Sequence, residues 1–91
     1  MTKAYTLKSL KKEKRIIKEL DTVVLSRNLP EHGLKRGDIG AVVHCYKDGE
    51  AFEVEFITGQ GKTVAVITLK KEDVRLMKDR EILHARKLQT V

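Results

Sequence analysis

The side chains best suited to metal binding or nucleophilic catalysis are three histidines and one cysteine. His32, His44 and His84 lie in separate segments, without the His-x-x-x-His or Cys-x-x-Cys spacing that marks a metal site. His44 and Cys45 are neighbours on a predicted strand, where successive side chains point to opposite faces, so the imidazole cannot serve as base for the thiol. We therefore expect no metal site, no cofactor and no nucleophilic catalysis.

Two glutamates on one strand suggest a different chemistry, the hydrolysis of a glycosidic bond. Glu53 and Glu55 share a strand face and lie about 7 Å apart by strand rise, a separation that glycosidases use. Nothing around them suggests a sugar cleft, which favours a solvated strand face. The run Gly59-Gln60-Gly61-Lys62 lacks the full spacing and the helix start of a phosphate loop. The sequence therefore predicts a protein that is not an enzyme.

The size and composition of the chain fit one small folded domain. It has 91 residues, of which 41% are apolar and 35% charged, enough for a single core but not for a deep pocket. One cysteine cannot form an intramolecular disulfide, and no apolar run approaches the roughly 18 residues that span a bilayer. The first residues also lack the apolar region of a signal peptide. We expect a cytoplasmic protein without a membrane span.

The net charge of +6 is unevenly distributed along the chain. Residues 1–20 carry seven bases and two acids, whereas residues 21–77 carry eight bases and nine acids. Residues 78–91 carry four bases and two acids. The positive charge therefore belongs to the two ends, and the middle of the chain is close to neutral.

Five short strands separated by turn signals are predicted in this neutral middle. They cover residues 21–27, 39–46, 52–56, 63–69 and 74–77. Asp48-Gly49 is the strongest turn signal, because a tight hairpin requires positive φ. Strict alternation places Phe52, Val54 and Phe56 in the core and the intervening glutamates in water. Since closure hides edges that so small a chain cannot cover with helices, we expect a mainly β, five-stranded barrel.

The two ends of the chain are predicted as separate segments flanking the barrel at 21–77. Within residues 1–20, five apolar side chains fall within about half of a helical wheel, which predicts a basic amphipathic helix. That helix could rest on the barrel, bind a membrane surface or nucleic acid, or remain disordered. Residues 78–91 could form a short helix or an added strand, and we favour the strand.

A recognisable motif begins before the second predicted strand. The run Arg36-Gly37-Asp38-Ile39-Gly40-Ala41-Val42 resembles the turn and strand signature of KOW-type SH3-like barrels. Together with the stretches DTVVL, LPEHGL, GDIGAVVH and GEAFEVEF, it resembles an uncharacterised family of small bacterial proteins. The resemblance runs from about Ile17 to Arg86 and leaves residues 1–16 outside. It implies an SH3-like barrel without an established activity, in which some members resemble the antitoxin-like partner of a two-gene pair.

The irregular loop after the first predicted strand is the first candidate binding surface. It combines an apolar pair, a histidine and two cations: Leu29, Pro30, His32, Lys35 and Arg36. Alternatively, Leu29 and Leu34 cap the open end of the barrel.

The second predicted strand supplies two further candidates. Cys45 shares one strand face with Ile39, Ala41 and Val43. This predicts that the face is core and that the thiol is buried and structural. His44 and Tyr46 lie on the opposite face, where they form a second contact patch if that face is outside, or part of the core if it is not.

These observations lead to two hypotheses about function. The first is a protein–protein binding module, the accessory or neutralising partner of an enzyme or toxin encoded nearby. The alternative is RNA or DNA binding through the basic N-terminal arm, whose phosphate-binding candidates are Lys8, Lys11, Lys12, Lys14, Arg15 and Lys18. Few aromatic side chains are available for base stacking, which favours the first hypothesis. The oligomeric state is open.

Overall fold

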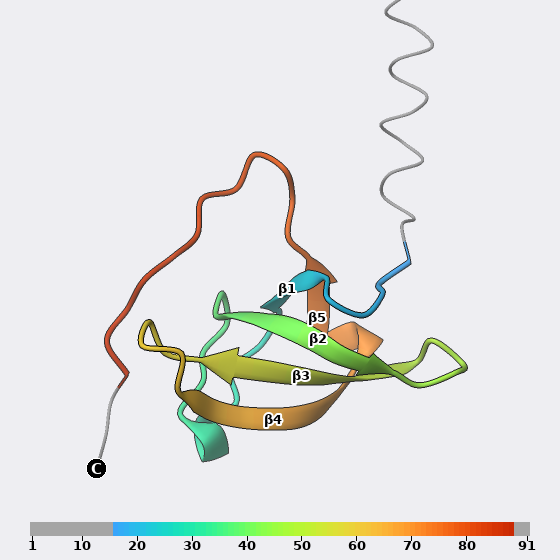
Figure 1. The fold of residues 1–91 in the computed structure, drawn as a ribbon, viewed down its shortest axis with the longest axis horizontal. Coiled ribbons are helices and arrows are strands. Elements are labelled where there is room, and N and C mark those ends of the chain that lie inside the picture. Colours follow the sequence, from blue (N-terminus) through green and yellow to red (C-terminus); the bar gives the residue numbers. More distant parts are fainter. Residues whose placement is uncertain (1–15, 89–91) are drawn as a thin grey trace, which may run out of the picture.

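A computed structural model of the chain describes residues 16–88. Five strands and two short 3-10 helices make up its regular structure (Figure 1). In chain order they are β1 (Thr22–Leu25), η1 (Pro30–His32), β2 (Ile39–Cys45), β3 (Ala51–Ile57), β4 (Thr63–Lys70), η2 (Lys71–Asp73) and β5 (Val74–Leu76). The predicted mainly β class and the five predicted strands are confirmed.

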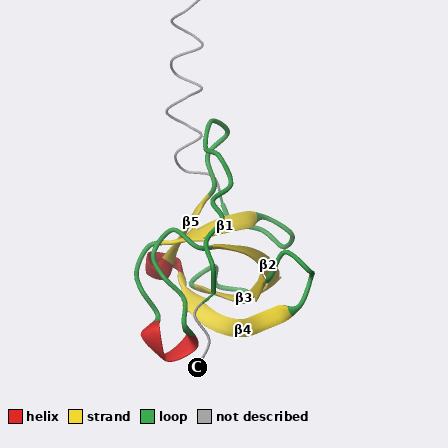
Figure 2. Ribbon diagram, turned by 90° about the vertical axis from the view of Figure 1, so that its left-hand side faces the viewer, coloured by secondary structure: helices red, strands yellow, loops and turns green. Residues whose placement is uncertain are grey.

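All five strands belong to one antiparallel sheet with the order β4-β3-β2-β1-β5. Figure 2 shows this sheet curled, with β1 and β5 on one side of the core and β3 and β4 on the other. No pairing joins β4 to β5 in the part of the chain that the structure describes, so the sheet is not closed as the predicted barrel would be. The three residues of η2 connect β4 directly to β5, and β5 is only three residues long and pairs with β1.

The core lies inside the curl of the sheet, and β3 supplies its centre. Phe52, Val54 and Phe56 are 3%, 0% and 2% exposed, which confirms the prediction from their alternation. Fully burying a side chain of this kind contributes about 1.5–3 kcal/mol. At the β2–β3 turn Gly49 has a φ of 72°, as the Asp-Gly signal predicted.

The face of β2 that turns toward the core differs from the prediction. Gly40 and Val42 are buried, whereas Ala41 and Val43 are exposed. The pairing of β2 with β3 shifts between Val42 and His44, which indicates a β-bulge. After this bulge Cys45 returns to the inner side, pairs with Phe52 and packs against the core. The thiol is therefore partly buried, but not through the strand face that we predicted for it.

The described start of the chain forms a turn and not the end of a helix. The main helix prediction falls on residues 1–15, which lie outside the described residues, but residues 16–20 were included in it and are not helical. Leu20 has a φ of 74°, and its N–H donates to the Val42 carbonyl at 2.7 Å. The Asp21 carboxylate accepts the Lys18 N–H at 2.8 Å, which closes the turn. Since Ile17 packs against the core, residues 16–20 are attached to the sheet.

The C-terminal segment, residues 77–88, forms neither the strand nor the helix that we predicted for 78–91. It runs without regular structure around the end of the sheet (Figure 1). Side-chain hydrogen bonds hold this segment against the sheet in place of strand pairing. Glu81 binds Arg75, and Arg86 binds Asp38. Between those contacts the adjacent Ile82 and Leu83 are both exposed, without the alternation of buried and exposed side chains that marks a half-buried strand. Within residues 16–88, no helix is long and apolar enough to cross a membrane.

Candidate functional site

The outer side of β2, β3 and β4 carries a hydrogen-bonded cluster centred on Glu53. Register pairs His44 with Glu53 and Glu53 with Thr68, so the three side chains form a row across the sheet. The Tyr46 hydroxyl and the Thr68 hydroxyl both donate to Glu53 Oε2, each at 2.5 Å. The rings of His44 and Tyr46 meet edge to face, with centroids 4.8 Å apart and planes at 87°. Tyr46 is therefore fixed at its hydroxyl and at its ring.

Hydroxyl donors fix both glutamates of β3. Thr63 Oγ1 donates to Glu55 Oε2 at 2.7 Å, as Thr68 does to Glu53. Hydrogen bonds from Thr68 and Tyr46 hold the pKa of Glu53 below its ordinary value, so this carboxylate stays ionised at neutral pH. The hydrogen bond to Glu53 raises the pKa of Tyr46, which keeps the phenol protonated as a donor. No described residue donates to Oε1 of either glutamate.

Exposed apolar side chains surround these carboxylates. Val43, Ile57 and Val66 are 43%, 56% and 54% exposed, and Tyr46 is 41% exposed. We call the whole surface the outer patch; it consists of Val43, His44, Tyr46, Glu53, Glu55, Ile57, Val66 and Thr68. Single exposed apolar residues are ordinary, but a group on one sheet face around an ordered polar centre has the composition of a binding surface.

The loop candidates fall into two groups. Leu29 is 1% exposed and Leu34 is 4% exposed, and both belong to the core. The prediction that Leu29 lies at the surface as a partner contact is therefore wrong, and its alternative, that the two leucines cap the open end, fits their burial. Backbone bonds pair these two leucines with each other, which turns both side chains inward. The other predicted loop residues, Pro30, His32, Lys35 and Arg36, are exposed.

His44 and Tyr46 lie on the outside of the sheet, the arrangement for which we predicted a second contact patch. No hydrogen bond, ion pair or ring contact within residues 16–88 joins them to the loop candidates. Of the six cations proposed for nucleic acid, Lys18 is exposed, and the other five lie outside the described residues. RNA or DNA binding through that arm stays a prediction.

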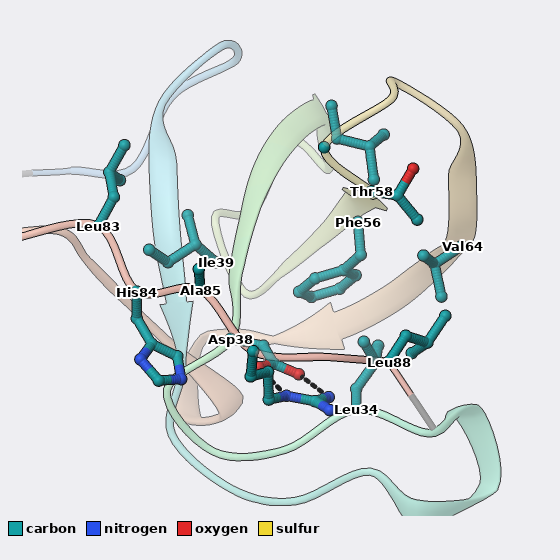
Figure 3. Close-up of a pocket in the computed structure, with 13 residues that line it drawn as sticks. Leu34, Asp38, Ile39, Phe56, Thr58, Val64, Leu83, His84, Ala85 and Leu88 are labelled. Carbon is teal, nitrogen blue, oxygen red and sulfur yellow. Dashed lines mark hydrogen bonds and ion pairs between the residues drawn. The ribbon is translucent and has the colours of Figure 1, made fainter. Parts of the chain in front are cut away.

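A groove of about 420 Å³ lies between the C-terminal segment and the end of the sheet (Figure 3). Leu34, Ile39, Phe56 and Val64 line it from the sheet and its loop, and Leu88 lines it from the C-terminal segment. Most of its wall is therefore apolar.

The polar part of this groove is an ion pair between Asp38 and Arg86. Arg86 Nε donates to Asp38 Oδ1 at 2.8 Å, and a second guanidinium nitrogen donates to Oδ2 at 2.6 Å and to the Gly33 carbonyl at 2.9 Å. Asp38 Oδ2 also accepts the Lys35 N–H at 2.8 Å. Burial alone raises the pKa of Asp38, but the hydrogen bonds from Arg86 and Lys35 outweigh it and lower the pKa below its ordinary value. Since the carboxylate is already occupied, it fastens the C-terminal segment and is not free to act as an acid or base.

Acid is expected to weaken the fold through Asp38. Its folded pKa lies below the unfolded value, so the ionised carboxylate stabilises the protein above about pH 4. That contribution is lost as the pH falls through the folded pKa. We expect Asp38→Asn to cost about 1 kcal/mol at neutral pH and the difference from wild type to shrink toward pH 2, in urea unfolding followed by circular dichroism.

Asp79→Asn is the matched control for this pH series. Asp79 is exposed and has no hydrogen bond to its side chain among residues 16–88, so this variant should follow wild type at every pH. The Asp38→Asn variant should still lose some stability in acid, because hydrogen bonds from Arg75 lower the pKa of Glu81 to about 2. A constant difference between Asp38→Asn and wild type from pH 7 to pH 2 would contradict the assignment.

The remaining titratable residues are held by neighbouring groups or lie apart from one another. Glu53 and Glu55 each accept hydrogen bonds from hydroxyl groups of the protein on the outer side of the sheet. Among residues 16–88, no three histidine, cysteine or acidic side chains lie close enough together to hold a metal ion. Burial raises the pKa of the Cys45 thiol, which lowers the thiolate fraction.

The chain matches a known protein family over the residues that form the sheet. A family model described as a domain of unknown function, DUF4926, matches residues 19–76, more than half of the 91-residue chain. The chain belongs to the DUF4926 family. The match starts just before β1 and ends with the last residue of β5. No curated protein and no solved structure matches the chain significantly.

The DUF4926 match contains the outer patch but not the C-terminal segment. It ends at Leu76, whereas the motif resemblance predicted a similarity that continued to Arg86. The Asp38–Arg86 ion pair thus joins one residue inside the DUF4926 region to one outside it.

Several residues of the outer patch were not predicted as binding residues. Val43, Ile57, Val66 and Thr68 are exposed, and the strand register places Val66 beside Glu55 and Thr68 beside Glu53, whereas Ile57 lies at the far end of β3 and also lines the groove. The alternation on β3 already predicted that Glu53 and Glu55 face outward. The outward-facing residues of the neighbouring strands could therefore have been added to the candidate binding residues. Val43 could not have been found in this way, because only the bulge brings it and its neighbour His44 to the same side of the sheet.

Proposed function

We propose that this protein is a non-catalytic protein–protein binding module, the accessory or neutralising partner of an enzyme or toxin. The outer patch is the observation that supports it. It combines exposed apolar side chains with a tyrosine whose ring and hydroxyl are both fixed by neighbours.

Side chains of the outer patch that are already held in place before binding favour association with another protein. An exposed side chain that must be immobilised on association costs about 0.5–1.5 kcal/mol, and this cost falls when the side chain is already fixed. Tyrosine is enriched among the residues that dominate binding energy, and Tyr46 has an exposed ring beside Glu53. A surface of this kind fits a partner of defined shape.

The finer fold that we propose is SH3-like. A strand order of β4-β3-β2-β1-β5, an irregular loop after β1 and a 3-10 turn before β5 resemble that architecture. In this proposal the C-terminal segment and the buried Leu29 and Leu34 cover the part of the curl that strand pairing leaves open.

The binding function is tested by co-expression with the products of the neighbouring genes in the native host. Wild-type protein should purify in a stoichiometric complex with one of them, and the complex should re-form from the two purified proteins. Val66→Lys places a charge on the outer patch at a position that is 54% exposed, so it should lower the affinity at least about tenfold without unfolding the protein.

Ile82→Lys is the matched control. Ile82 is an apolar residue that is 89% exposed on the C-terminal segment, so this change introduces the same charge away from the outer patch. The control complex should keep wild-type affinity. Recovery of the wild-type protein without any stoichiometric partner would count against a binding module, and equal effects of the two substitutions would count against the outer patch.

A further inference from the structure

We propose that the outer patch binds an extended, cationic segment of the partner protein, whose lysine or arginine side chains lie two residues apart. This inference rests on the proposed function and adds the chemistry of the partner. It follows from the charge of the patch, from the direction of its two carboxylates and from their spacing.

The charge of the outer patch is negative. Glu53 and Glu55 belong to it, and none of its eight residues is lysine or arginine. Glu19 adds a third carboxylate at the edge, 3.7 Å from the His44 ring. Lys70 follows Thr68 on the same face of β4 and marks the border at the end of that strand. A partner with an excess of cations complements this surface, whereas an acidic partner or a nucleic acid is repelled by it.

The two carboxylates have a defined direction. The hydroxyl groups of Thr63 and Thr68, both on β4, donate to Glu55 and Glu53, and the Tyr46 hydroxyl donates to Glu53 from the β2 side. All their described hydrogen bonds end on Oε2, so Oε1 of each glutamate can accept a hydrogen bond from a partner. Because their orientation is already set, the carboxylates lose little side-chain freedom on binding.

The spacing of the carboxylates selects an extended segment. Residues two apart on a strand repeat about every 7 Å, which is the separation of Glu53 and Glu55 along β3. An extended partner segment presents its own alternate side chains with the same repeat. Lysine or arginine side chains at positions i and i+2 can therefore meet both carboxylates at once, while a helix does not place positions i and i+2 on one face.

The exposed valines of the outer patch strengthen the binding of a cationic segment. Val43 and Val66 border the carboxylates, and an aliphatic lysine or arginine stem can cover them. Water around an exposed ion pair weakens it. Covering the two valines displaces that water and strengthens the ion pairs with the partner. The partner segment is therefore expected to be both cationic and rich in aliphatic surface.

Two short synthetic peptides with the same alternating valine frame provide the test. One carries lysine and the other glutamate at every second position, and each is titrated into the full chain while amide resonances are followed by NMR. The lysine peptide should shift resonances of β2, β3 and β4 around the outer patch. The glutamate peptide should bind at least about tenfold more weakly.

Glu53→Gln/Glu55→Gln is the diagnostic variant, and Glu31→Gln/Glu72→Gln is its control. Both remove two negative charges, but Glu31 and Glu72 are exposed on η1 and η2, away from the outer patch. Only the diagnostic variant should bind the lysine peptide about tenfold more weakly than wild type does. The circular dichroism spectrum of this variant should match that of wild type. Equal binding of both peptides, or equal loss in both variants, would overturn the proposal.

Two further outcomes separate this inference from others. Concentration-dependent shifts at the outer patch without peptide would mean that a second copy covers it, and that the cationic partner is wrong. If Val66→Lys disrupts the natural complex but Glu53→Gln/Glu55→Gln does not, the binding function stands and the cationic chemistry fails. If neither variant disrupts that complex, the proposed function of the outer patch fails as well.

Discussion

Gly40→Ala is expected to lower the free energy of unfolding by about 2–3 kcal/mol, a large share of the roughly 5–10 kcal/mol that a domain of this size has. Gly40 is buried in β2, where β3 packs directly against its backbone. A Cβ atom there would lie 2.6 Å from Val54 Cγ1, 2.9 Å from Phe56 Cε2 and 3.0 Å from the Glu55 carbonyl oxygen. Such distances force the strands apart, because a close-packed core has no space for an added methyl group.

Urea unfolding of Gly40→Ala and Gly59→Ala measures this effect against a matched control. Gly59 lies in the turn before β4, and no atom beyond its chain neighbours lies within 4 Å of the position of an added Cβ. Its replacement should change stability by less than about 0.5 kcal/mol. If both alanine variants unfold at the wild-type urea concentration, the close approach of β2 and β3 is not as described.

Leu29→Ala is expected to cost about 2–5 kcal/mol of stability, because it removes a buried side chain and leaves a cavity. Leu29 is 1% exposed and packs in the core together with Leu34, although both belong to an irregular loop. A rim residue that only contacts a partner would cost almost nothing. The urea midpoint of the isolated protein therefore distinguishes a core leucine from a binding leucine.

Leu20→Ala provides the comparison for Leu29→Ala. It removes the same side chain from a position that is 86% exposed, so it should stay within about 0.5 kcal/mol of wild type. Similar unfolding midpoints for the two leucine variants would contradict the placement of Leu29 in the core.

Local patterns were sufficient to predict the strands and their most important turn. On β3 the alternation of phenylalanine, valine and glutamate determines which face is buried, because side chains on a strand alternate by geometry. The Asp48-Gly49 pair predicts a hairpin, since a residue with positive φ is needed there and Gly49 provides it. Both features depend on neighbours in the sequence only.

Features that depend on distant contacts could not be predicted in this way. The bulge after Val42 appears only when β2 is aligned with β3, and it separates Val43, which is exposed, from Cys45, which packs against the core, although both were assigned to one face. Asp38 and Arg86 are 48 positions apart, so the course of the C-terminal segment is set by a pairing that no local pattern contains. The burial of Leu29 likewise depends on a loop folding back over the core.

Only part of the outer patch could be predicted, because some of it depends on contacts between distant residues. His44 and Tyr46 were identified on one strand, and the exposure of Glu53 and Glu55 followed from alternation. Their assembly into one surface required the register of three strands, which determines that Thr68 lies beside Glu53.

The attachment of residues 16–20 has a practical consequence for binding assays. The Ile17 carbonyl lies 3.7 Å from the Cys45 sulfur, and Glu19 lies at the same distance from the His44 ring, so the chain enters the sheet next to the outer patch. An affinity tag fused directly before Ile16 would be tethered within reach of that surface, at an effective concentration in the millimolar range. Such a tag competes with any weak partner, and a basic one competes most.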